Sequence, residues 1–450
     1  MVKRGLLLLL PIVFLLAAFL LVPAVLRAVP SRYVARLPEP LQALAMPPNQ
    51  APILPTVVVA ADTSNLLRRV ASPTAAAGAI APMPPTFTAV PLAGTPTALS
   101  PTFTPEHVPT QTVVPTASPT PLPAAAAARL EGFEHQFQLW NNCGPATLAM
   151  TLSYFDLHLT QSETAAILKP NPEDRNVSPY EMVAYVNDQT PFAALTRANG
   201  TRDTIRRFIA HGIPVILEIG IEPPGEFRWM GWYGHYLLVV AYDDAAGQFW
   251  VYDSWLGTSN VPLENADKNG RVLTYEDFER DWAHFNRTYI AIYRPEQADL
   301  VAAIVGAEMD DSVMWGNALA RAQADAAAQP DNAFFWFNLG TNYNALGQYE
   351  EAATAFHQAR AIGLPWRMLW YQFGPYDAYY QTGRYQDVIL LADVTLKDRP
   401  YFEESFYYKG MALAALGDTG AARENLEKAT SFNPNFAPAV AALEELEIGD

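Results

Sequence analysis

The pattern of hydrophobic and polar positions divides the chain of 450 residues into four segments of different character. Residues 1–30 hold one continuous apolar run, and residues 31–128 show neither helical nor strand periodicity. Residues 129–297 mix short apolar runs, typical of buried strands, with amphipathic stretches typical of helices. Residues 298–450 are Ala-rich and amphipathic at helical spacing. The pattern predicts an α+β domain followed by an all-α domain, and the chain is long enough for two hydrophobic cores.

The apolar run near the N-terminus extends from Leu6 to Leu26 without a charged residue. About twenty apolar residues in a helix cross the roughly 30 Å of hydrocarbon in a bilayer, so we expect one transmembrane anchor. A cleaved signal peptide is the alternative, but it has a shorter apolar region, and Val22–Val29 matches a small-x-small cleavage site poorly. Lys3 and Arg4 precede the run and predict that the rest of the chain lies outside the cytoplasmic membrane, although three arginines soon after the run reduce this charge asymmetry.

Residues 31–128 are dominated by Pro, Thr and Ala. They contain 19 of the 38 prolines, and no charged residue stands between Arg69 and Glu106. Such a stretch cannot bury enough apolar surface to offset the entropy lost on ordering, and its Pro-Thr units favour extended, polyproline-like conformations. We therefore expect residues 31–128 to form a disordered stalk. The alternative is that this segment is a ligand for a proline-recognising domain.

Turn residues interrupt the C-terminal helical segment at a fixed interval. Prolines at positions 330, 365, 400 and 434 lie 35, 35 and 34 residues apart. The positions after the first proline resemble the tetratricopeptide repeat, in which paired helices stack through small residues and bury a shared apolar seam. This resemblance covers about residues 315–440 and implies a protein-binding solenoid. It rests on Trp336-x-x-Leu339-Gly340-x-x-Tyr343, followed by Gly347-x-Tyr349, Ala352, Phe356 and Ala359.

The second copy of the repeat departs from this pattern. Gly374 marks its start, but Pro375 follows directly, and Val388 stands where the first copy has Ala352. Because proline removes a helical hydrogen bond, we expect the first helix of this copy to be kinked or to start late. The remaining marks are Gly383 and Tyr385 in the second copy, and Gly410, Gly417, Ala421, Leu426 and Ala429 in a third.

Cys143 is the only cysteine in the chain and lies at a predicted helix start. Asn141 and Asn142 are cap formers, Pro145 suits the first helical turn, and Ala146–Phe155 is apolar at helical spacing. The partial positive charge at a helix N-terminus favours a thiolate over a thiol, as a cysteine nucleophile requires. One cysteine also excludes an intramolecular disulfide and a multi-cysteine metal site. Taken alone, a single cysteine in an apolar helix is more often a buried structural residue.

His235 and Asp253 fall on a predicted β-hairpin. A strand-like apolar run follows His235, residues 243–247 form a short loop, and Gln248–Tyr252 alternates as a second strand. A five-residue loop pairs 242 with 248 and 237 with 253, which puts Asp253 on the same face as His235 and within reach of its ring. A carboxylate there fixes the imidazole tautomer and stabilises its charged form.

Each of these residues has a plain structural interpretation by itself, His235 as a strand-end histidine and Asp253 as a turn residue. Their joint placement with Cys143 favours a catalytic triad. Three motifs resemble the bacteriocin-processing type of papain-like cysteine peptidase, in its stand-alone form without a transporter. They are Gln138-x4-Cys143-Gly-Pro, Gly234-His235 at a strand start, and Tyr252-Asp253 about eighteen residues later.

The resemblance implies an α+β papain-like cysteine peptidase domain over residues 129–297 and a role for each site residue. Cys143 attacks the scissile carbonyl, His235 takes and returns the proton, and Asp253 orients His235. Gln138 and the backbone N–H of Cys143 hold the oxyanion. Gln136 stands nearby, so a solvated glutamine beside a helix is the alternative for Gln138.

Charge and motif content argue against several other function classes. The formal net charge is −17 and no folded segment carries a Lys/Arg cluster, so we expect no nucleic-acid partner. No His, Asp and Glu grouping has metal-ligand spacing and no glycine-rich phosphate loop occurs, so we expect neither a metal nor another cofactor. The histidines at positions 107, 135, 158, 211, 284 and 357 lack a strand-opening glycine or a carboxylate at hairpin distance.

The sequence thus predicts a membrane-anchored cysteine peptidase whose all-α repeats, residues 298–450, recruit a protein substrate or partner. The alternative is a catalytically silent module that binds peptides with the same fold and repeats. Acyl transfer to an amine is a third possibility, because a thioester intermediate reacts with amines as well as with water. Transporter-linked peptidases of the resembled type cut on the cytoplasmic side, whereas Lys3 and Arg4 predict an outside location.

Overall fold

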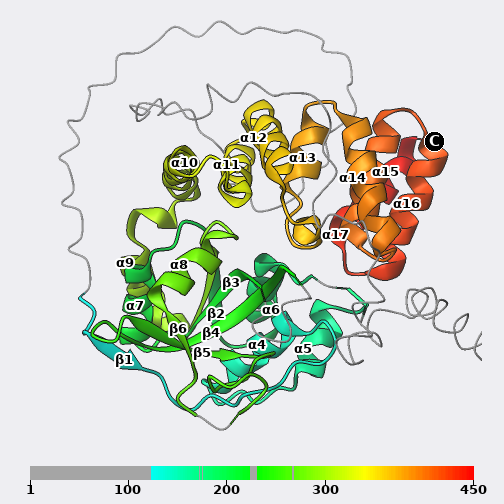
Figure 1. Cartoon of the computed structure of the whole chain (residues 1–450). Coiled ribbons are helices and arrows are strands. Elements are labelled where there is room, and N and C mark those ends of the chain that lie inside the picture. The colour runs from blue at the N-terminus through cyan, green and yellow to red at the C-terminus, as the bar shows by residue number, and fades with distance from the viewer. Residues whose placement is uncertain (1–122, 172, 175, 223–230, 266–267, 450) are drawn as a thin grey trace, which may run out of the picture.

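The computed structural model describes residues 123–171, 173–174, 176–222, 231–265 and 268–449 (Figure 1). The predicted anchor, residues 1–30, and nearly all of the predicted stalk lie outside the described residues. Among the helices of the described part, none is both long enough and apolar enough to cross a membrane.

The first domain is built on an antiparallel sheet of seven strands, in the order β2-β7-β3-β4-β5-β6 with β1 beside β4. Helices cover both faces of this sheet, with α4, α5 and α6 on one face and α7, α8 and α9 on the other (Figure 1). The strands are β1 (Ala127–Arg129), β2 (Ala193–Arg197), β3 (Val215–Ile221), β4 (Tyr233–Asp243), β5 (Gln248–Asp253), β6 (Arg271–Thr274) and β7 (Tyr289–Tyr293). The helices are α4 (Cys143–Ser153), α5 (Gln161–Leu168), α6 (Pro179–Gln189), α7 (Arg202–Ala210), α8 (Tyr275–Ala283) and α9 (Ala298–Val305).

The central strand β4 is buried along almost its whole length, because its alternating side chains face two separate cores. Leu237 and Val239 pack with Phe208 and Phe278, under α7 and α8. Tyr236 packs on the opposite face with Leu148 of α4. Val301 and Ile304 of α9 also lie in the core of this domain, which therefore extends past residue 297.

The β4–β5 hairpin has a different register near its turn from the predicted one. The prediction of a 242–248 pair is wrong, because Asp243 pairs with Gln248 and Tyr242 with Phe249. The register then shifts by one residue between Val239 and Ala241. Val240 is left out of the pairing between β4 and β5, as in a β-bulge. Leu237 consequently pairs with Asp253, as predicted.

The second domain consists of antiparallel helix pairs that follow one another along the chain (Figure 1). Gly340 shows why small residues are needed between paired helices, because a Cβ atom there would lie 2.7 Å from the ring of Phe356. The α-helices are α10 (Asp311–Ala328), α11 (Ala333–Ala345), α12 (Tyr349–Ile362), α13 (Gly374–Gln381), α14 (Tyr385–Asp398), α15 (Glu403–Ala415), α16 (Thr419–Phe432) and α17 (Ala437–Gly449). Short 3-10 turns are η2 (Pro295–Gln297), η3 (Gly306–Met309) and η4 (Trp366–Trp370).

The first helix of the second repeat starts late, as the sequence predicts. Helix α13 has 8 residues, whereas α11 and α15 in the neighbouring repeats have 13 each. Pro375 stands in its first turn, where a missing N–H costs no helical hydrogen bond. The 3-10 turn η4 and residues 371–373 occupy the place of the missing helical turns.

The two domains share one continuous apolar cluster. The ring of Tyr371, just after η4, lies 5.9 Å from the ring of Trp232 and 6.0 Å from that of Phe285. Polar contacts reinforce this interface, since Asn338 Nδ2 donates to the carbonyl oxygen of Ala283 at 2.6 Å and Arg367 Nη1 donates to that of Trp232 at 3.0 Å. The repeats therefore pack directly against the end of the sheet at which the central strand β4 begins.

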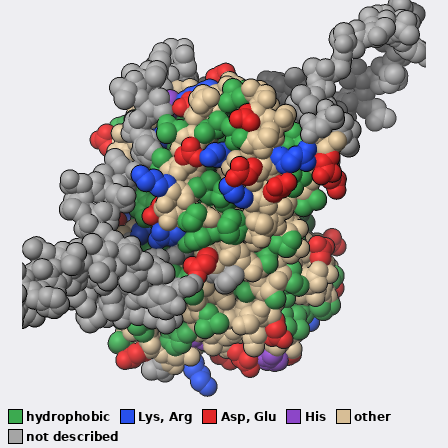
Figure 2. Space-filling model, turned by 90° about the vertical axis from the view of Figure 1, so that its right-hand side faces the viewer, with side chains coloured by type: hydrophobic (Ala, Val, Ile, Leu, Met, Phe, Trp, Pro, Cys, Tyr) green, Lys and Arg blue, Asp and Glu red, His purple; other side chains and the backbone are tan. Residues whose placement is uncertain are grey.

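One face of the molecule is mixed in charge. On the face shown in Figure 2, Lys and Arg side chains stand among Asp and Glu side chains, with apolar side chains between them.

Candidate active site

Cys143 is the first residue of α4, and its side chain is half-buried. The chain reaches this helix through Asn141, which has a positive φ of 56°, so the turn before the helix is tight. Asn142 occupies the predicted N-cap position, but its side chain donates to Gln161 Oε1 at 3.3 Å and does not cap the helix. The unpaired backbone N–H groups of the first turn of α4 therefore lie next to Cys143. The positive end of the helix dipole lies there too.

His235 lies between Cys143 and Asp253. Its Nε2 atom is 2.8 Å from Asp253 Oδ1, and its side chain lines one small pocket together with Cys143. Because Nε2 faces Asp253, Nδ1 is the ring nitrogen left for the thiol. Burial by itself lowers the pKa of His235, but the charge and hydrogen bond of Asp253, and then the neighbouring Cys143, raise it to about 9. The imidazole is thus charged at neutral pH.

Asp253 is completely buried and fully hydrogen-bonded. Oδ1 also accepts from the backbone N–H groups of Trp255 and Leu256, at 2.8 and 2.9 Å. Arg271 Nη2 donates to Oδ2 at 2.9 Å. Burial favours the neutral acid, yet the charges of His235 and Arg271 hold the pKa of Asp253 well below its usual range.

Arg271 is a site residue that sequence reasoning missed. It lies on β6, which pairs with the outer edge of β5 and places Arg271 opposite Val251. A short alternating run at residues 271–274 was the available signal for a third strand, but nothing local connects it to Asp253.

The structure separates the two glutamines before Cys143. Gln136 bridges two backbone groups, since Nε2 donates to Leu159 O at 2.7 Å and Oε1 accepts from Gln161 N at 2.9 Å. Gln138 lies next to the triad instead, because its Oε1 accepts from Ser254 Oγ at 2.9 Å and its N–H donates to Ser254 O. Gln138 also lines a groove of about 280 Å³ with Phe137, Trp255 and Leu263.

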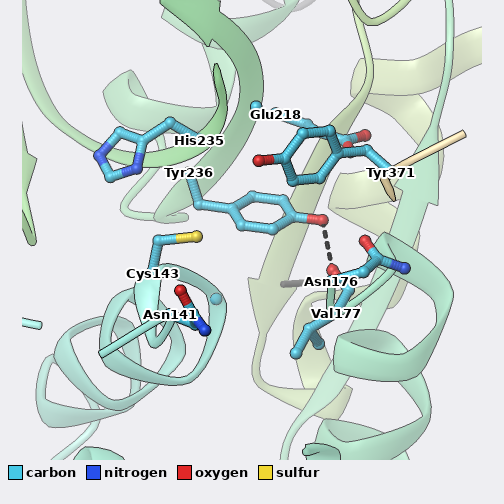
Figure 3. Close-up of a pocket in the computed structure, with 10 residues that line it drawn as sticks. Asn141, Cys143, Asn176, Val177, Glu218, His235, Tyr236 and Tyr371 are labelled. Atoms are coloured by element: carbon cyan, nitrogen blue, oxygen red, sulfur yellow. Dashed lines mark hydrogen bonds between the residues drawn. The ribbon is translucent and has the colours of Figure 1, made fainter. Parts of the chain in front are cut away.

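A second, much smaller pocket lies directly against Cys143 (Figure 3). Its volume is about 10 Å³, enough for roughly one water molecule. Cys143, His235 and Tyr236 line it together with Glu218 of β3 and Tyr371 of the repeat domain. Sequence reasoning missed the last two residues. A glutamate inside the apolar run of β3 was a signal for Glu218, whereas no local pattern places Tyr371 here.

His135 and His284, two of the remaining histidines, have structural contacts. His135 Nε2 lies 2.8 Å from the carbonyl oxygen of Asp253, and the ring of His284 stacks on Phe334 at 3.8 Å. Within the described part of the chain, no group of three or more His, Cys, Asp and Glu side chains could hold a metal ion.

Comparisons with known proteins agree with this architecture. The model of the Peptidase_C39 like family matches residues 130–290, and the tetratricopeptide repeat model matches residues 335–359 and 403–436. The two matched repeats flank the repeat whose first helix is shortened. No curated protein matches the chain.

The solved structures that resemble the chain do so only distantly. A Bacillus anthracis protein described as a C39-like peptidase is 15% identical, covers 37% of this chain and 96% of its own, and has a TM-score of 0.29. MamA is 17% identical, with 31% of this chain and 80% of its own covered and a TM-score of 0.27. At these values neither likeness carries a conclusion about function.

Proposed function

Because residues 130–290 form a Peptidase_C39-like domain and tetratricopeptide repeats follow it, we propose that this protein is a cysteine peptidase that hydrolyses peptide bonds. Cys143 is the nucleophile, His235 the general base and acid, and Asp253 the carboxylate that orients His235. The observation that carries the proposal is the position of His235, which lines one small pocket with Cys143 and lies 2.8 Å from Asp253 Oδ1 through its Nε2.

The proposed reaction proceeds through a thioester. The Cys143 thiolate, paired with charged His235, attacks the scissile carbonyl carbon and forms a C–S bond. Gln138 and the Cys143 backbone N–H stabilise the oxyanion, which forms at the start of α4. The C–N bond then breaks, and His235 gives its proton to the leaving nitrogen. Water, activated by His235, attacks the thioester and releases the carboxylate and the thiol; an amine in place of water gives transpeptidation.

Asp253 and Arg271 support this chemistry without touching the substrate. Asp253 fixes the ring of His235 so that Nδ1 faces the sulfur, and its charge stabilises the imidazolium. Two backbone N–H groups and Arg271 keep Asp253 ionised although it is buried.

A catalytically silent peptide-binding module is the second candidate. The pocket beside Cys143 holds only about 10 Å³ and is bounded by Tyr371 of the repeat domain, which favours a site that does not readily admit a substrate. In either case, we propose that the repeats recruit a protein partner. The repeats also contact the peptidase-like domain of their own chain.

The N-terminal anchor and the location outside the membrane remain part of the proposal and rest on residues 1–30 alone. A reporter fused after residue 130 tests them: activity specific to the cytoplasm would contradict an outside location.

The peptidase proposal is tested with Cys143→Ala. We expect this variant to lose peptide hydrolysis and labelling by thiol-directed electrophiles, and to keep the melting temperature of the wild type. Hydrolysis retained by Cys143→Ala would rule out the mechanism. Labelling of wild-type Cys143 without hydrolysis of any peptide in a diverse library would favour the silent module.

A further inference from the structure

The pocket beside Cys143 is formed by both domains. Glu218 and Tyr236 come from neighbouring strands, where they pair in register, and Tyr371 comes from the repeat domain. Figure 3 shows Cys143, Tyr236, Glu218 and Tyr371 around the same space. The site that we propose as catalytic is therefore completed by a residue outside the peptidase-like domain.

Glu218 is an unusual residue for the wall of such a pocket. Its side chain is only 3% exposed. Its Oε2 atom has no hydrogen-bond partner among the described residues, although the side chain of Gln372 lies near the carboxyl group. A buried polar atom without a partner destabilises the folded state. A group that donates hydrogen bonds and carries a positive charge would satisfy Glu218 best.

The other lining side chains offer Glu218 no free counter-charge. Of the described residues that line the pocket, His235 alone can be cationic, and it is already hydrogen-bonded to Asp253. Burial, and then the proximity of Cys143, raise the pKa of Glu218 well above its ordinary value. A cation in the pocket would reverse this effect, because an opposite charge at short range stabilises the ionised carboxylate.

The pocket is closed on the side of the repeat domain. Tyr371 is buried and packs against Trp232 and Phe285, so this wall is part of the interdomain core. The short helix α13 makes this possible, because residues 371–373 continue from the 3-10 turn where α11 and α15 have helix. The larger groove beside Trp255 lies next to His235, whose ring is 6.5 Å from that of Trp255. A peptide that reaches Cys143 can thus extend into this groove but ends at Glu218.

A closed pocket accepts only an end of a peptide, and charge decides which end. A terminal carboxylate would be repelled by Glu218, whereas a terminal ammonium group would pair with it. We propose that this pocket binds the free α-ammonium group of a peptide, with Glu218 as its counter-charge and Tyr371 as the closing wall. The protein would then be an amino-terminal exopeptidase, and this inference rests on the proposed peptidase function.

The reaction releases a short product from the amino terminus. Cys143 forms a thioester with the amino-terminal fragment, the C–N bond breaks, and His235 protonates the nitrogen of the remaining chain. Water then cleaves the C–S bond and leaves the fragment with a free carboxylate. A pocket of about 10 Å³ admits the ammonium group alone, so the amino-terminal fragment that Cys143 binds ends there.

Matched peptides test the proposal. Wild-type protein is given the same peptides with a free or an acetylated amino terminus, and products are identified by mass spectrometry. We expect kcat/KM to be at least about tenfold higher for the free amine, which corresponds to about 1.4 kcal/mol of binding energy. Equal values for the two forms, or cleavage mainly at internal bonds, would overturn the proposal.

Substitution of the acid identifies the recognising group. Glu218→Gln keeps the size of the side chain and removes the charge, so we expect the preference for the free amine to fall close to one, mainly through KM. Glu222→Gln is the matched control, because Glu222 is exposed just beyond the same strand and should keep the preference. If Glu218→Gln does not fold, Tyr371→Ala provides the second variant, because removing the ring that closes the pocket should increase cleavage of the acetylated peptide at least about threefold. A Glu218→Gln protein that keeps the wild-type preference, or a Tyr371→Ala protein without this increase, would contradict the assignment.

A dipeptidyl vinyl sulfone with a free or acetylated amino terminus separates failure of this inference from failure of the proposed function. Faster labelling of Cys143 by the free-amine reagent, without hydrolysis of any peptide, would support recognition of the amino terminus and refute the peptidase activity. Hydrolysis together with equal labelling by both reagents would keep the peptidase activity and refute the recognition.

Discussion

The carboxylate of Asp253 accepts a hydrogen bond from Arg271 on one oxygen, at 2.9 Å, and holds His235 on the other, at 2.8 Å. The neighbouring strands β4, β5 and β6 thus bring His235, Asp253 and Arg271 into one hydrogen-bonded series. Since Asp253 is completely buried, Arg271 is the cation that balances the carboxylate when His235 loses its proton during the reaction.

Arg271→Met should lower kcat/KM and the melting temperature more at low pH than at high pH. The folded-state pKa of Asp253 is depressed, so its ionised form stabilises the native protein above the unfolded pKa, and this stability is lost as the pH falls through the folded pKa. Without Arg271 the folded pKa rises, so we expect both kcat/KM and the melting temperature to fall off at a higher pH on the acid side, with about a tenfold loss of kcat/KM at neutral pH.

Arg280→Gln is the control for this measurement, because Arg280 is 59% exposed and pairs with Asp277 and Asp281 on its own helix. If kcat/KM and the melting temperature of Arg271→Met depend on acidic pH as in the wild type, Arg271 does not act on Asp253.

The charge on His235 predicts the alkaline limit of activity. Its folded pKa of about 9 lies above the unfolded value of about 6.5, so the stability that protonated His235 contributes is complete below about pH 6.5 and is lost as the pH rises through about 9. We expect kcat/KM to fall above about pH 9, because the leaving nitrogen needs the imidazolium proton. A kcat/KM that already falls near pH 6.5, the ordinary value for a histidine, would contradict a charged His235.

Gly340→Ala should destabilise the repeat domain. The added Cβ would lie 2.7 Å from the Phe356 ring, which is completely buried, so α11 and α12 would have to separate at a cost of about 1–3 kcal/mol. Gly316→Ala is the matched substitution in α10, where nothing lies within 4 Å of the new Cβ and helix propensity favours alanine. We expect the melting temperature to fall for Gly340→Ala and to stay unchanged or rise for Gly316→Ala; the same change in both would refute the packing argument.

Acids packed at the interface predict that the contact between the domains weakens as the pH rises. Asp174 and Glu181 come from the peptidase-like domain, and Glu403 and Glu404 from the start of α15. Burial, and then the neighbouring carboxylates, raise the pKa of Glu404, and burial raises that of Glu181 to about 8. A raised folded pKa means that the unfolded chain loses its protons first, so stability decreases with pH between about 4.5 and 8.

Glu404→Gln should therefore raise the melting temperature at pH 8 by about 2 °C or more and have little effect at pH 5. The amide keeps an oxygen that can accept from Asn176, as Glu404 Oε1 does in the wild type at 3.4 Å. Exposed Glu424→Gln, which removes one carboxylate from α16, serves as the control. A gain of the same size at both pH values would mean that titration of these acids does not govern the interface.

Much of the site could be predicted because its signals are local in the sequence. The position of Cys143 at a helix start follows from the cap formers, the proline and the apolar spacing after it. The 237–253 pair follows from the period of the two strands, although the predicted loop was one residue too long and a bulge at Val240 compensated for it. The late start of α13 follows from Pro375 and the repeat period.

The repeat period, the only thiol and the order of Cys143, His235 and Asp253 were thus determined by the sequence itself, because helical and strand periodicities and turn residues act over a few positions. Tertiary structure alone decided that Arg271 reaches Asp253, that Gln136 and not Gln138 holds α5, and that Glu218 and Tyr371 close the pocket beside Cys143. These contacts join residues far apart in the chain, and no local period encodes which strand edges pair or where one domain packs on another. The three residues expected from the sequence do meet in the structure, but their surroundings depend on how the repeats dock.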